Sequence, residues 1–295
     1  MQEFSGGYDF RRVRLLVDNS GSFSFFHYWG WQLNPFWTDK LPSEIGTVRF
    51  IDSKGFSAES RWNQIAVLGD GMFRVVVYQN ECGETKWEYR WLSRDDLFAC
   101  LWTSSDLGTV RILIDDSGTA GYLPYVVLGR IMPYIMLKHD AITFHGVLME
   151  HEGRGIILSA PSGIGKTTHA HLWRDHKRAL ILNGDRATCC KEDGRWIGFS
   201  LPWSGTSGEC IHRDVPLTAF VSLEQSLENS VERITGLEAF GAVMPNLLYP
   251  SWDRELTEKA LDFIDDFLEK VPVFRLRCRP DVDAVETLDR ALREL

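Results

Sequence analysis

The stretch Ser159-Ala160-Pro161-Ser162-Gly163-Ile164-Gly165-Lys166-Thr167-Thr168 decides the expected fold of this 295-residue chain. An apolar run at residues 155–158 precedes it, and a helical pattern at residues 166–173 follows it. Strand, glycine-rich turn and helix in this order are typical of a phosphate-binding loop. The backbone N–H groups of such a turn and the positive end of the helix dipole both attract anions. The stretch predicts nucleotide binding, and a chance Gly-Lys-Thr in a loop is the alternative.

Two side chains of this loop have expected ligands. Lys166 is expected to reach the β and γ phosphates of ATP, and the Thr167 hydroxyl is expected to bind Mg²⁺. The first position of the motif is Ala160 where a glycine is usual. Because alanine disfavours a positive φ, we expect the turn to differ slightly at this point.

The bulk composition indicates a soluble, cytoplasmic protein. With 44% hydrophobic residues, the chain can form a large core. The net charge of −9 argues against a nucleic-acid-binding surface. A basic peptide partner is compatible with this charge. The first residues lack a signal-peptide pattern, and the most apolar region, residues 122–137, contains Pro124, Arg130 and Pro133 and is too short to span a membrane. The six cysteines form no C-x-x-C pair and are expected to be reduced thiols.

Residues 1–120 are expected to form a smaller, mostly-β N-terminal domain. Apolar or alternating runs predict strands at residues 13–17, 47–51, 65–68, 73–78, 86–91 and 110–114. Gly69-Asp70-Gly71 is a turn signal between two of them. The aromatic residues between Gly21 and Trp37 serve either core and inter-domain packing or an apolar or peptide ligand. A polar cluster at residues 115–118 marks the expected domain boundary.

Residues 121–295 are expected to form the α/β domain that carries the phosphate-binding loop. Its patterns predict helices at residues 122–139, where Pro133 kinks or splits the helix, and at 235–243, 254–270 and 283–295. Strands are expected at residues 141–149, 179–182, 188–191, 196–199, 217–223 and 273–276. A turn at residues 151–154 joins the first of these strands to the strand before the loop as a hairpin. The sheet is therefore expected to be mixed and not purely parallel.

Asp185 is the first candidate for chemistry outside the loop. It follows the short apolar strand at residues 179–182, which comes directly after the loop helix. A carboxylate in this position is typical of a metal-binding or proton-accepting aspartate, with a simple turn aspartate as the alternative. The segment at residues 202–209 is polar, rich in small residues and carries one acid, Glu209. Such a segment beside a nucleotide is often mobile and functional.

Several motifs together resemble the HPr kinase/phosphorylase family, whose core is related to phosphoenolpyruvate carboxykinases. They are His145-Gly146-Val147-Leu148, the loop followed by Thr168, and Leu182-Asn183-Gly184-Asp185-Arg186. Further motifs look like the stand-alone HPr-kinase-like proteins of peptide natural-product clusters, including those beside lasso-peptide precursors. These motifs are Pro202-Trp203-Ser204-Gly205, Val215-Pro216-Leu217, Leu223-Glu224-Gln225 and residues 271–280. The resemblance covers roughly residues 122–295 and implies an HPr kinase-like P-loop core with a mixed sheet.

The resemblance also implies roles for individual residues. It implies phosphate contacts from Ser162, Gly163, Ile164, Gly165, Lys166, Thr167 and Thr168. It places Mg²⁺ at Thr167, a catalytic histidine at His145, and the catalytic, metal-proximal carboxylate at Asp185. Glu209 is the candidate for the family's second acidic site near the metal. The family usually has two consecutive aspartates where this chain has Gly184 and Asp185, which argues against a reverse, phosphorolytic activity.

Together these observations predict an ATP- and Mg²⁺-dependent kinase that phosphorylates a hydroxyl group. The resemblance favours a serine of a peptide, most plausibly the C-terminal residue of a ribosomally made precursor, and HPr itself is not expected. A small-molecule kinase, for example one acting on free serine, stays open, as does a nucleotide-gated binding protein that hydrolyses ATP slowly. His145 as a core histidine, residues 1–120 as a scaffold, and a homo-oligomer stay open too. The absence of an Asn-Lys-x-Asp motif argues against a GTPase.

Overall fold

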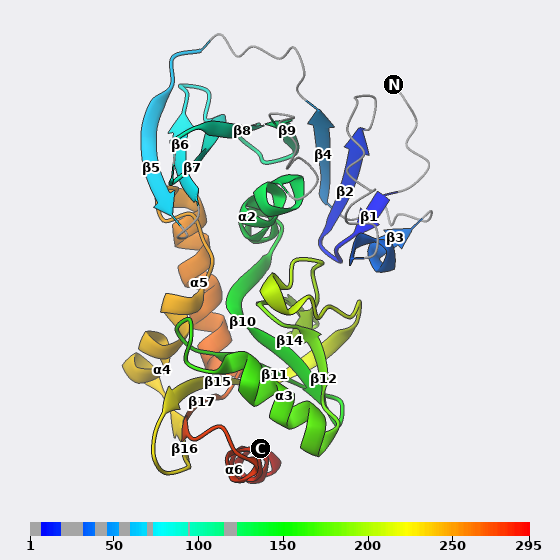
Figure 1. Ribbon diagram of the computed structural model, residues 1–295, viewed down its shortest axis with the longest axis vertical. Coiled ribbons are helices and arrows are strands. Elements are labelled where there is room, and N and C mark those ends of the chain that lie inside the picture. Colours follow the sequence, from blue (N-terminus) through cyan, green and yellow to red (C-terminus); the bar gives the residue numbers. More distant parts are fainter. Residues whose placement is uncertain are drawn as a thin grey trace. The chain divides into compact units, whose positions relative to one another are not determined.

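The computed structural model describes residues 7–18, 32–38, 46–52, 60–69, 73–93, 95–114 and 123–295. The chain divides into two compact units, Met1–His139 and Asp140–Leu295 (Figure 1). The boundary expected from the sequence precedes helix α2 (Leu123–Lys138), whereas the division in the structure follows it. The reason is that α2 packs against strands β8 and β9 of the first unit. Pro133 lies inside α2, which continues on both sides of it and is not split.

In its described part, the first unit contains one sheet with the strand order β3-β1-β2-β4-β9-β8-β7-β6-β5. The strands are β1 (Gly7–Asp9), β2 (Val13–Asp18), β3 (Trp37–Thr38), β4 (Gly46–Asp52), β5 (Asn63–Gly69), β6 (Phe73–Gln79), β7 (Thr85–Trp91), β8 (Leu97–Thr103) and β9 (Thr109–Ile114). A short 3-10 helix, η1 (Asn34–Phe36), precedes β3. Among the described strands, β4 pairs in parallel with β2 and with β9, and the other pairings are antiparallel. The unit is mostly β, as expected, although the sequence did not predict β1, β3 or β8.

The alternation of side chains along β7 shows why this sheet forms. Trp87 and Tyr89 are buried on the face that packs against α2, where the Trp87 ring lies 5.7 Å from the Tyr134 ring. On the opposite face, Glu88 accepts hydrogen bonds from Lys86 at 2.8 Å and from Arg90 at 3.1 Å. A strand with one apolar and one charged face is the pattern that a half-buried sheet requires.

Some sequence predictions concern residues outside the described ones. These are the turn at Asp70 and Gly71, the aromatic residues up to position 31, and the polar cluster at residues 115–118. From the end of the aromatic segment, Phe36 is described and buried, with its ring 5.5 Å from that of Phe10. None of the helices in the described ranges is long and apolar enough to cross a membrane.

The second unit, which is described throughout, is built on two sheets that share two long strands. The strands are β10 (Ala141–His151), β11 (Arg154–Ser159), β12 (Leu180–Asn183), β13 (Arg186–Glu192), β14 (Arg195–Phe199), β15 (Asp214–Gln225), β16 (Ser230–Ile234) and β17 (Val273–Cys278). The N-terminal parts of β10 and β15 form an antiparallel sheet with β13 and β14. Their remaining parts join β11, β12, β16 and β17 in a mixed sheet, in which β11 and β17 pair in parallel with β15. The expected mixed sheet is therefore present, and β16 is the strand that the sequence did not predict.

Helices pack against both sheets of this unit. They are α3 (Lys166–Lys177), α4 (Gly236–Val243), α5 (Arg254–Lys270) and α6 (Val282–Arg293), with the 3-10 helices η2 (Gly205–Ser207) and η3 (Met244–Asn246). A buried apolar cluster joins α3 and α6 to β10, β11, β15 and β17. On α5, Phe267 packs against Phe144 of β10 at 5.2 Å and against Trp196 of β14 at 5.2 Å. Asp253 and Asp281 cap α5 and α6 by accepting the N–H groups of Leu256 and Ala284.

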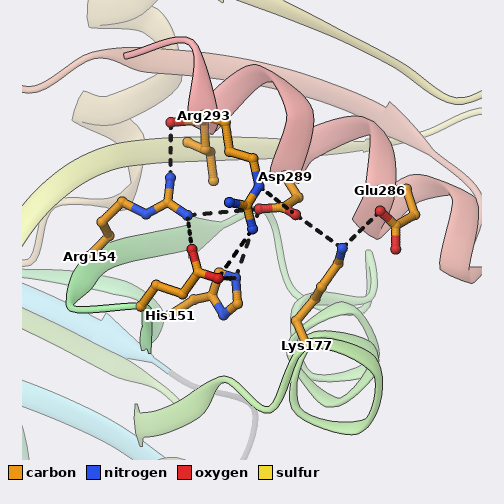
Figure 2. A network of polar contacts seen from close by, with 8 residues as sticks. His151, Arg154, Lys177, Glu286, Asp289 and Arg293 are labelled. Atoms are coloured by element: carbon orange, nitrogen blue, oxygen red, sulfur yellow. Dashed lines mark hydrogen bonds and ion pairs between the residues drawn. The ribbon is translucent and has the colours of Figure 1, made fainter.

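Figure 2 shows the polar network that fixes α6. The carboxylate of Asp289, which is only 3% exposed as a residue, lies 3.0 Å from Lys177 of α3 and 3.2 Å from Arg293. Arg154, at the start of β11, donates a hydrogen bond of 3.1 Å to the carbonyl of Leu292. Burial raises the pKa of Asp289, but the hydrogen bonds from Lys177 and Arg293 outweigh burial and leave this pKa below its usual value. The network therefore holds a charged Asp289 that joins α6 to α3.

Candidate functional site

The predicted phosphate-binding loop connects the end of β11 at Ser159 to the start of α3 at Lys166. Gly163 and Gly165 have positive φ values of 82° and 116°, which only glycine adopts without strain. A Cβ atom at either position would meet nothing within 4 Å, so the space beside the loop is open. Ala160 is fully buried and does not have a positive φ. The expected conflict at the first motif position is therefore absent, because the backbone there suits alanine.

The other loop residues lie where an anion above the loop can reach them. Ser162, Thr167 and Thr168 are exposed, and Ile164 is half-buried. Thr167 and Thr168 belong to the first turn of α3, where backbone N–H groups lack helical partners. The loop therefore presents hydroxyl and N–H groups around an open space, which is the arrangement that binds phosphate.

Lys166 is the buried cation of this site. Its Nζ atom donates a hydrogen bond of 2.7 Å to the carbonyl of Ala160 and lies 3.2 Å from Nε2 of His145. Burial lowers the pKa of Lys166, and the nearby Asp185 opposes this shift. The side chain thus folds over its own loop, with its charge held between the loop and β10.

His145 of β10 connects the loop to the next strand end. Its Nε2 atom faces the Lys166 ammonium, which can only donate, so Nε2 acts as the acceptor. In the neutral ring the proton then sits on Nδ1, which lies 3.4 Å from Oδ1 of Asp185. Burial is the largest cause that lowers the pKa of His145, and the charges of Lys166 and Arg186 add to it, while Asp185 opposes it. A neutral His145 therefore bridges Lys166 and Asp185.

Asp185 lies between β12 and β13, and its backbone is fixed on both sides. Its N–H group donates to Oδ1 of Asn183 at 3.0 Å, and its carbonyl accepts from Gly146 of β10 at 2.9 Å. Gly205 lies so close that a Cβ atom there would be 2.7 Å from Cγ of Asp185. The Arg186 Nε atom is 3.7 Å from the other carboxylate oxygen. These contacts hold the carboxylate beside His145.

Asn183 is a site residue whose role the sequence reasoning missed. Its side chain is fully buried and accepts the N–H groups of both Asp185 and Arg186. Its amide donates to the carbonyls of Leu201 and Trp203, at 2.7 and 3.2 Å. Asn183 thus ties the segment after β14 to the turn that carries Asp185. An asparagine at the end of an apolar strand was the available signal, and this residue type often fixes tight turns.

Glu209 contacts the helix that follows the loop. Its Oε1 atom accepts a hydrogen bond of 2.8 Å from Arg174, and its Oε2 atom lies 3.0 Å from Nε2 of His171. Both partners belong to α3, and the carbonyl of Glu209 accepts the N–H group of Gly184 at 3.1 Å. The structure therefore brings Lys166, His145 and Asp185 together. The carboxylate of Glu209 instead contacts side chains of α3.

A cavity of about 640 Å³ lies beside the loop. Its walls include Gly163, Ile164, Thr168 and His169 from the loop and α3. The carboxyl ends of β15 and β17 supply Leu223, Gln225 and Cys278, and Leu227, Arg279 and Pro280 follow these ends. Gln225 donates a hydrogen bond of 3.2 Å to the carbonyl of Ile164, which ties the loop to β15. The cavity combines apolar walls with a few polar groups, as small-molecule sites do.

The donor set of the site fits Mg²⁺. The Thr167 hydroxyl and the Asp185 carboxylate, which the sequence analysis assigns to the metal, offer oxygen atoms. Mg²⁺ is usually held by one or two protein oxygens together with phosphates and waters. No group of three or more His, Cys, Asp or Glu side chains among the described residues could hold a metal by itself. A metal at this site would therefore bind together with a phosphate ligand.

The chain was compared with protein families, curated sequences and solved structures. No protein-family model matches the chain, and no curated protein sequence matches it. Among solved structures, the chain is similar to the Hpr(Ser) kinase/phosphatase from Coxiella burnetii, with 14% sequence identity and a TM-score of 0.32. The match covers 52% of this chain and 96% of that chain.

Proposed function

We propose that this protein is an ATP-dependent phosphotransferase that acts on a hydroxyl group. The observation that carries the proposal is the bridge formed by His145, which contacts Lys166 at 3.2 Å and Asp185 at 3.4 Å. A phosphate-binding loop alone indicates nucleotide binding. A carboxylate held next to the loop lysine adds the group that transfer to a hydroxyl needs.

In this proposal the triphosphate of ATP lies on the loop and the nucleoside occupies the cavity. The Lys166 ammonium exchanges its contact with the Ala160 carbonyl for phosphate oxygens, which form stronger, charge-assisted hydrogen bonds. Ile164, Leu223 and Pro280 supply apolar surface for the base, and Gln225 and Arg279 supply polar groups. Thr167 and Asp185 would hold Mg²⁺, which supplies neutralisation of the phosphate charge.

Asp185 orients the acceptor hydroxyl and takes its proton. The acceptor oxygen forms a bond to the γ phosphorus, the bond from that phosphorus to the β,γ-bridging oxygen breaks, and ADP leaves. His145 is neutral and contacts the Asp185 carboxylate, and Gly205 packs closely against the same side chain. Positioning of this kind, rather than covalent catalysis, accounts for most of the acceleration in phosphoryl transfer.

For the acceptor, we propose a serine of a peptide, most plausibly the C-terminal residue of a ribosomally made, lasso-type precursor. The support is the resemblance of residues 202–205 and 271–280 to peptide-cluster kinases. A second support is the sheet of the first unit, where β5 and β3 end the strand order within the described residues. An end strand can pair with an extended peptide through its main chain. Two copies of the chain can also pair by such strands, which would make a homo-oligomer.

The test is a mass-spectrometric screen of the purified protein with ATP, Mg²⁺ and candidate acceptors. The acceptors are peptides ending in serine, the same peptides ending in alanine, free serine and water. The expected result is a gain of one phosphoryl group only on the serine-ending peptides. Efficient phosphorylation of free serine would replace the peptide proposal by a small-molecule kinase. ATP hydrolysis without any phosphorylated acceptor would favour a nucleotide-gated binding protein.

A further inference from the structure

Leu227 is an apolar side chain at the open rim of the cavity beside the phosphate-binding loop. Leu223, near the carboxyl end of β15, lines the same cavity and is only 3% exposed, whereas Leu227 is 88% exposed. A single exposed leucine is ordinary on a protein surface, and Leu237 of α4 is as exposed as Leu227 without lining this cavity. The unusual feature of Leu227 is therefore its place at the rim of a cavity that begins at the loop.

The turn between β15 and β16, which carries Leu227, is fixed by hydrogen bonds on both sides of this residue. The N–H group of Ser226 donates to the carbonyl of Cys278 at 3.1 Å, which ties the turn to the end of β17. The hydroxyl of Ser226 accepts the N–H group of Glu228 at 3.2 Å, a local bond that stabilises tight turns. Leu227 therefore projects from a backbone of defined position.

Asn229 joins this turn to the segment that follows β17. Its side-chain oxygen accepts the N–H group of Arg279 at 2.9 Å, and its amide donates to the carboxylate of Asp281 at 2.9 Å. The same segment supplies Arg279 and Pro280 to the cavity. The rim at Leu227 and the wall at residues 279–280 are therefore bonded to each other and form one continuous surface.

A ligand whose phosphates lie on the loop can extend into this cavity. Residues of the loop and of the first turn of α3 line one part of it, so the cavity begins where the phosphates would bind. The other wall residues include three more apolar side chains, Ile164, Leu223 and Pro280. A nucleoside base is flat and largely apolar on its faces, and it gains affinity by covering such a surface.

We propose that Leu227 is a nucleoside contact, which packs against the base of a nucleotide whose phosphates lie on the loop. This inference rests on the proposed function and adds to it a residue that recognises the nucleoside part of ATP. The side chain of Leu227 loses contact with water when the base binds. Inorganic triphosphate binds to the loop without reaching the rim, so Leu227 contributes to the affinity for the nucleotide and not to the affinity for triphosphate.

The experiment titrates each variant by calorimetry with a non-hydrolysable ATP analogue and with inorganic triphosphate. Leu227→Ala removes the apolar contact, and Leu227→Met keeps an apolar side chain of similar size. Leu237→Ala is the matched control, because Leu237 is as exposed as Leu227 and does not line the cavity. Loss of the apolar contact predicts roughly 3- to 10-fold weaker analogue binding for Leu227→Ala. The Met variant and the control should bind the analogue like the wild type, and triphosphate binding should be unchanged in all three.

A second measurement uses the wild-type protein and needs no substitution. Cys278 lines the same cavity, and Cys82, an exposed cysteine of the first unit, is the internal reference. The analogue should slow the alkylation of Cys278 by iodoacetamide, measured by mass spectrometry, and leave that of Cys82 unchanged, whereas triphosphate should slow neither. Burial raises the pKa of the Cys278 thiol to about 11, so all reactions are compared at one alkaline pH.

Analogue binding by Leu227→Ala as tight as that of the wild type would overturn the inference. Equal weakening of analogue and triphosphate binding would do the same, as would alkylation of Cys278 that the analogue does not slow. These measurements record binding and need no phosphoryl transfer, so the inference can fail while the proposed function holds. A wild-type protein that binds neither ligand would disprove the loop assignment, and this inference with it.

Discussion

Gly184 faces Ser207 so closely that a Cβ atom at position 184 would overlap the Ser207 hydroxyl and lie 2.9 Å from the Ser207 Cβ atom. Ser207 belongs to η2, and its hydroxyl donates to the carbonyl of Ser204 at 2.8 Å. The resembled family usually has an aspartate in the position of Gly184. In this chain the η2 segment occupies the space that such a side chain would need. Of positions 184 and 185, only the second therefore carries an acid, Asp185.

This contact predicts that Gly184→Ala destabilises the protein. Overpacking of this kind costs about 1–3 kcal/mol in the free energy of unfolding, measured by chemical denaturation. Ser207→Gly removes the opposing side chain and should restore part of the loss in the double variant. Gly241→Ala is the matched control, because a Cβ atom there meets nothing within 4 Å and alanine favours the α4 helix. Equal stability of the Gly184→Ala and Gly241→Ala variants would contradict the packing described here.

The loop assignment predicts the effect of Lys166→Ala. Removal of the ammonium takes away a charge-assisted contact to phosphate, so turnover should be abolished and triphosphate binding lost. Circular dichroism should be unchanged. Lys270→Ala is the control, because Lys270 pairs with Asp266 on the α5 surface, and it should retain activity. Wild-type turnover by the Lys166→Ala variant would rule out the phosphate-binding loop.

Asp185 has no second acid beside it, so its substitution should be severe. We expect Asp185→Asn to lower kcat by at least roughly 10²-fold, as for loss of a general base, while ATP still binds. Asp193→Asn is the control: Asp193 is an exposed turn residue with a φ of 47°, which asparagine tolerates well. A decrease of only a few fold for Asp185→Asn would move the proton-accepting role elsewhere, with Glu209 as the next candidate.

The contacts of Glu209 predict a different response. Because Arg174 and His171 hold its carboxylate, Glu209→Gln should loosen the segment at residues 203–209 and lower kcat by only a few fold. Arg174→Gln removes the partner and should have a similar effect. The double variant should then lose little more than either single variant, since one interaction is shared. A loss for Glu209→Gln as large as that for Asp185→Asn, without a matching loss for Arg174→Gln, would show a direct catalytic role instead.

The proposed peptide acceptor predicts that deletion of the first unit raises the KM for the peptide. Because α2 packs with that unit, the deletion should remove residues 1–139 and not stop at residue 115. The KM for a serine-ending peptide should rise far more than the KM for ATP. Circular dichroism checks that the remaining unit is folded. An unchanged KM for the peptide would show that the first unit is a scaffold.

Local sequence determined the elements whose conformation depends on neighbouring residues. Gly163 and Gly165 adopt the positive φ values that shape the loop between β11 and α3. The helix predicted at residues 254–270 agrees with α5, because its apolar spacing and the Asp253 cap are local signals. The hairpin at residues 151–154 and the resulting mixed sheet were also predictable, since adjacent strands with a short turn pair with each other.

Only the tertiary structure decided which of these elements meet. The parallel pairing of β11 with β15 brings residues far apart in the sequence to one end of the sheet, and this pairing opens the cavity beside the loop. The segment that follows β14 passes beside Asp185. Gly184 therefore lies against Ser207, and Glu209 contacts Arg174 of α3. Strand order and side-chain contacts of this kind depend on the packing of the whole unit, whereas the loop and the helices depend on their own residues.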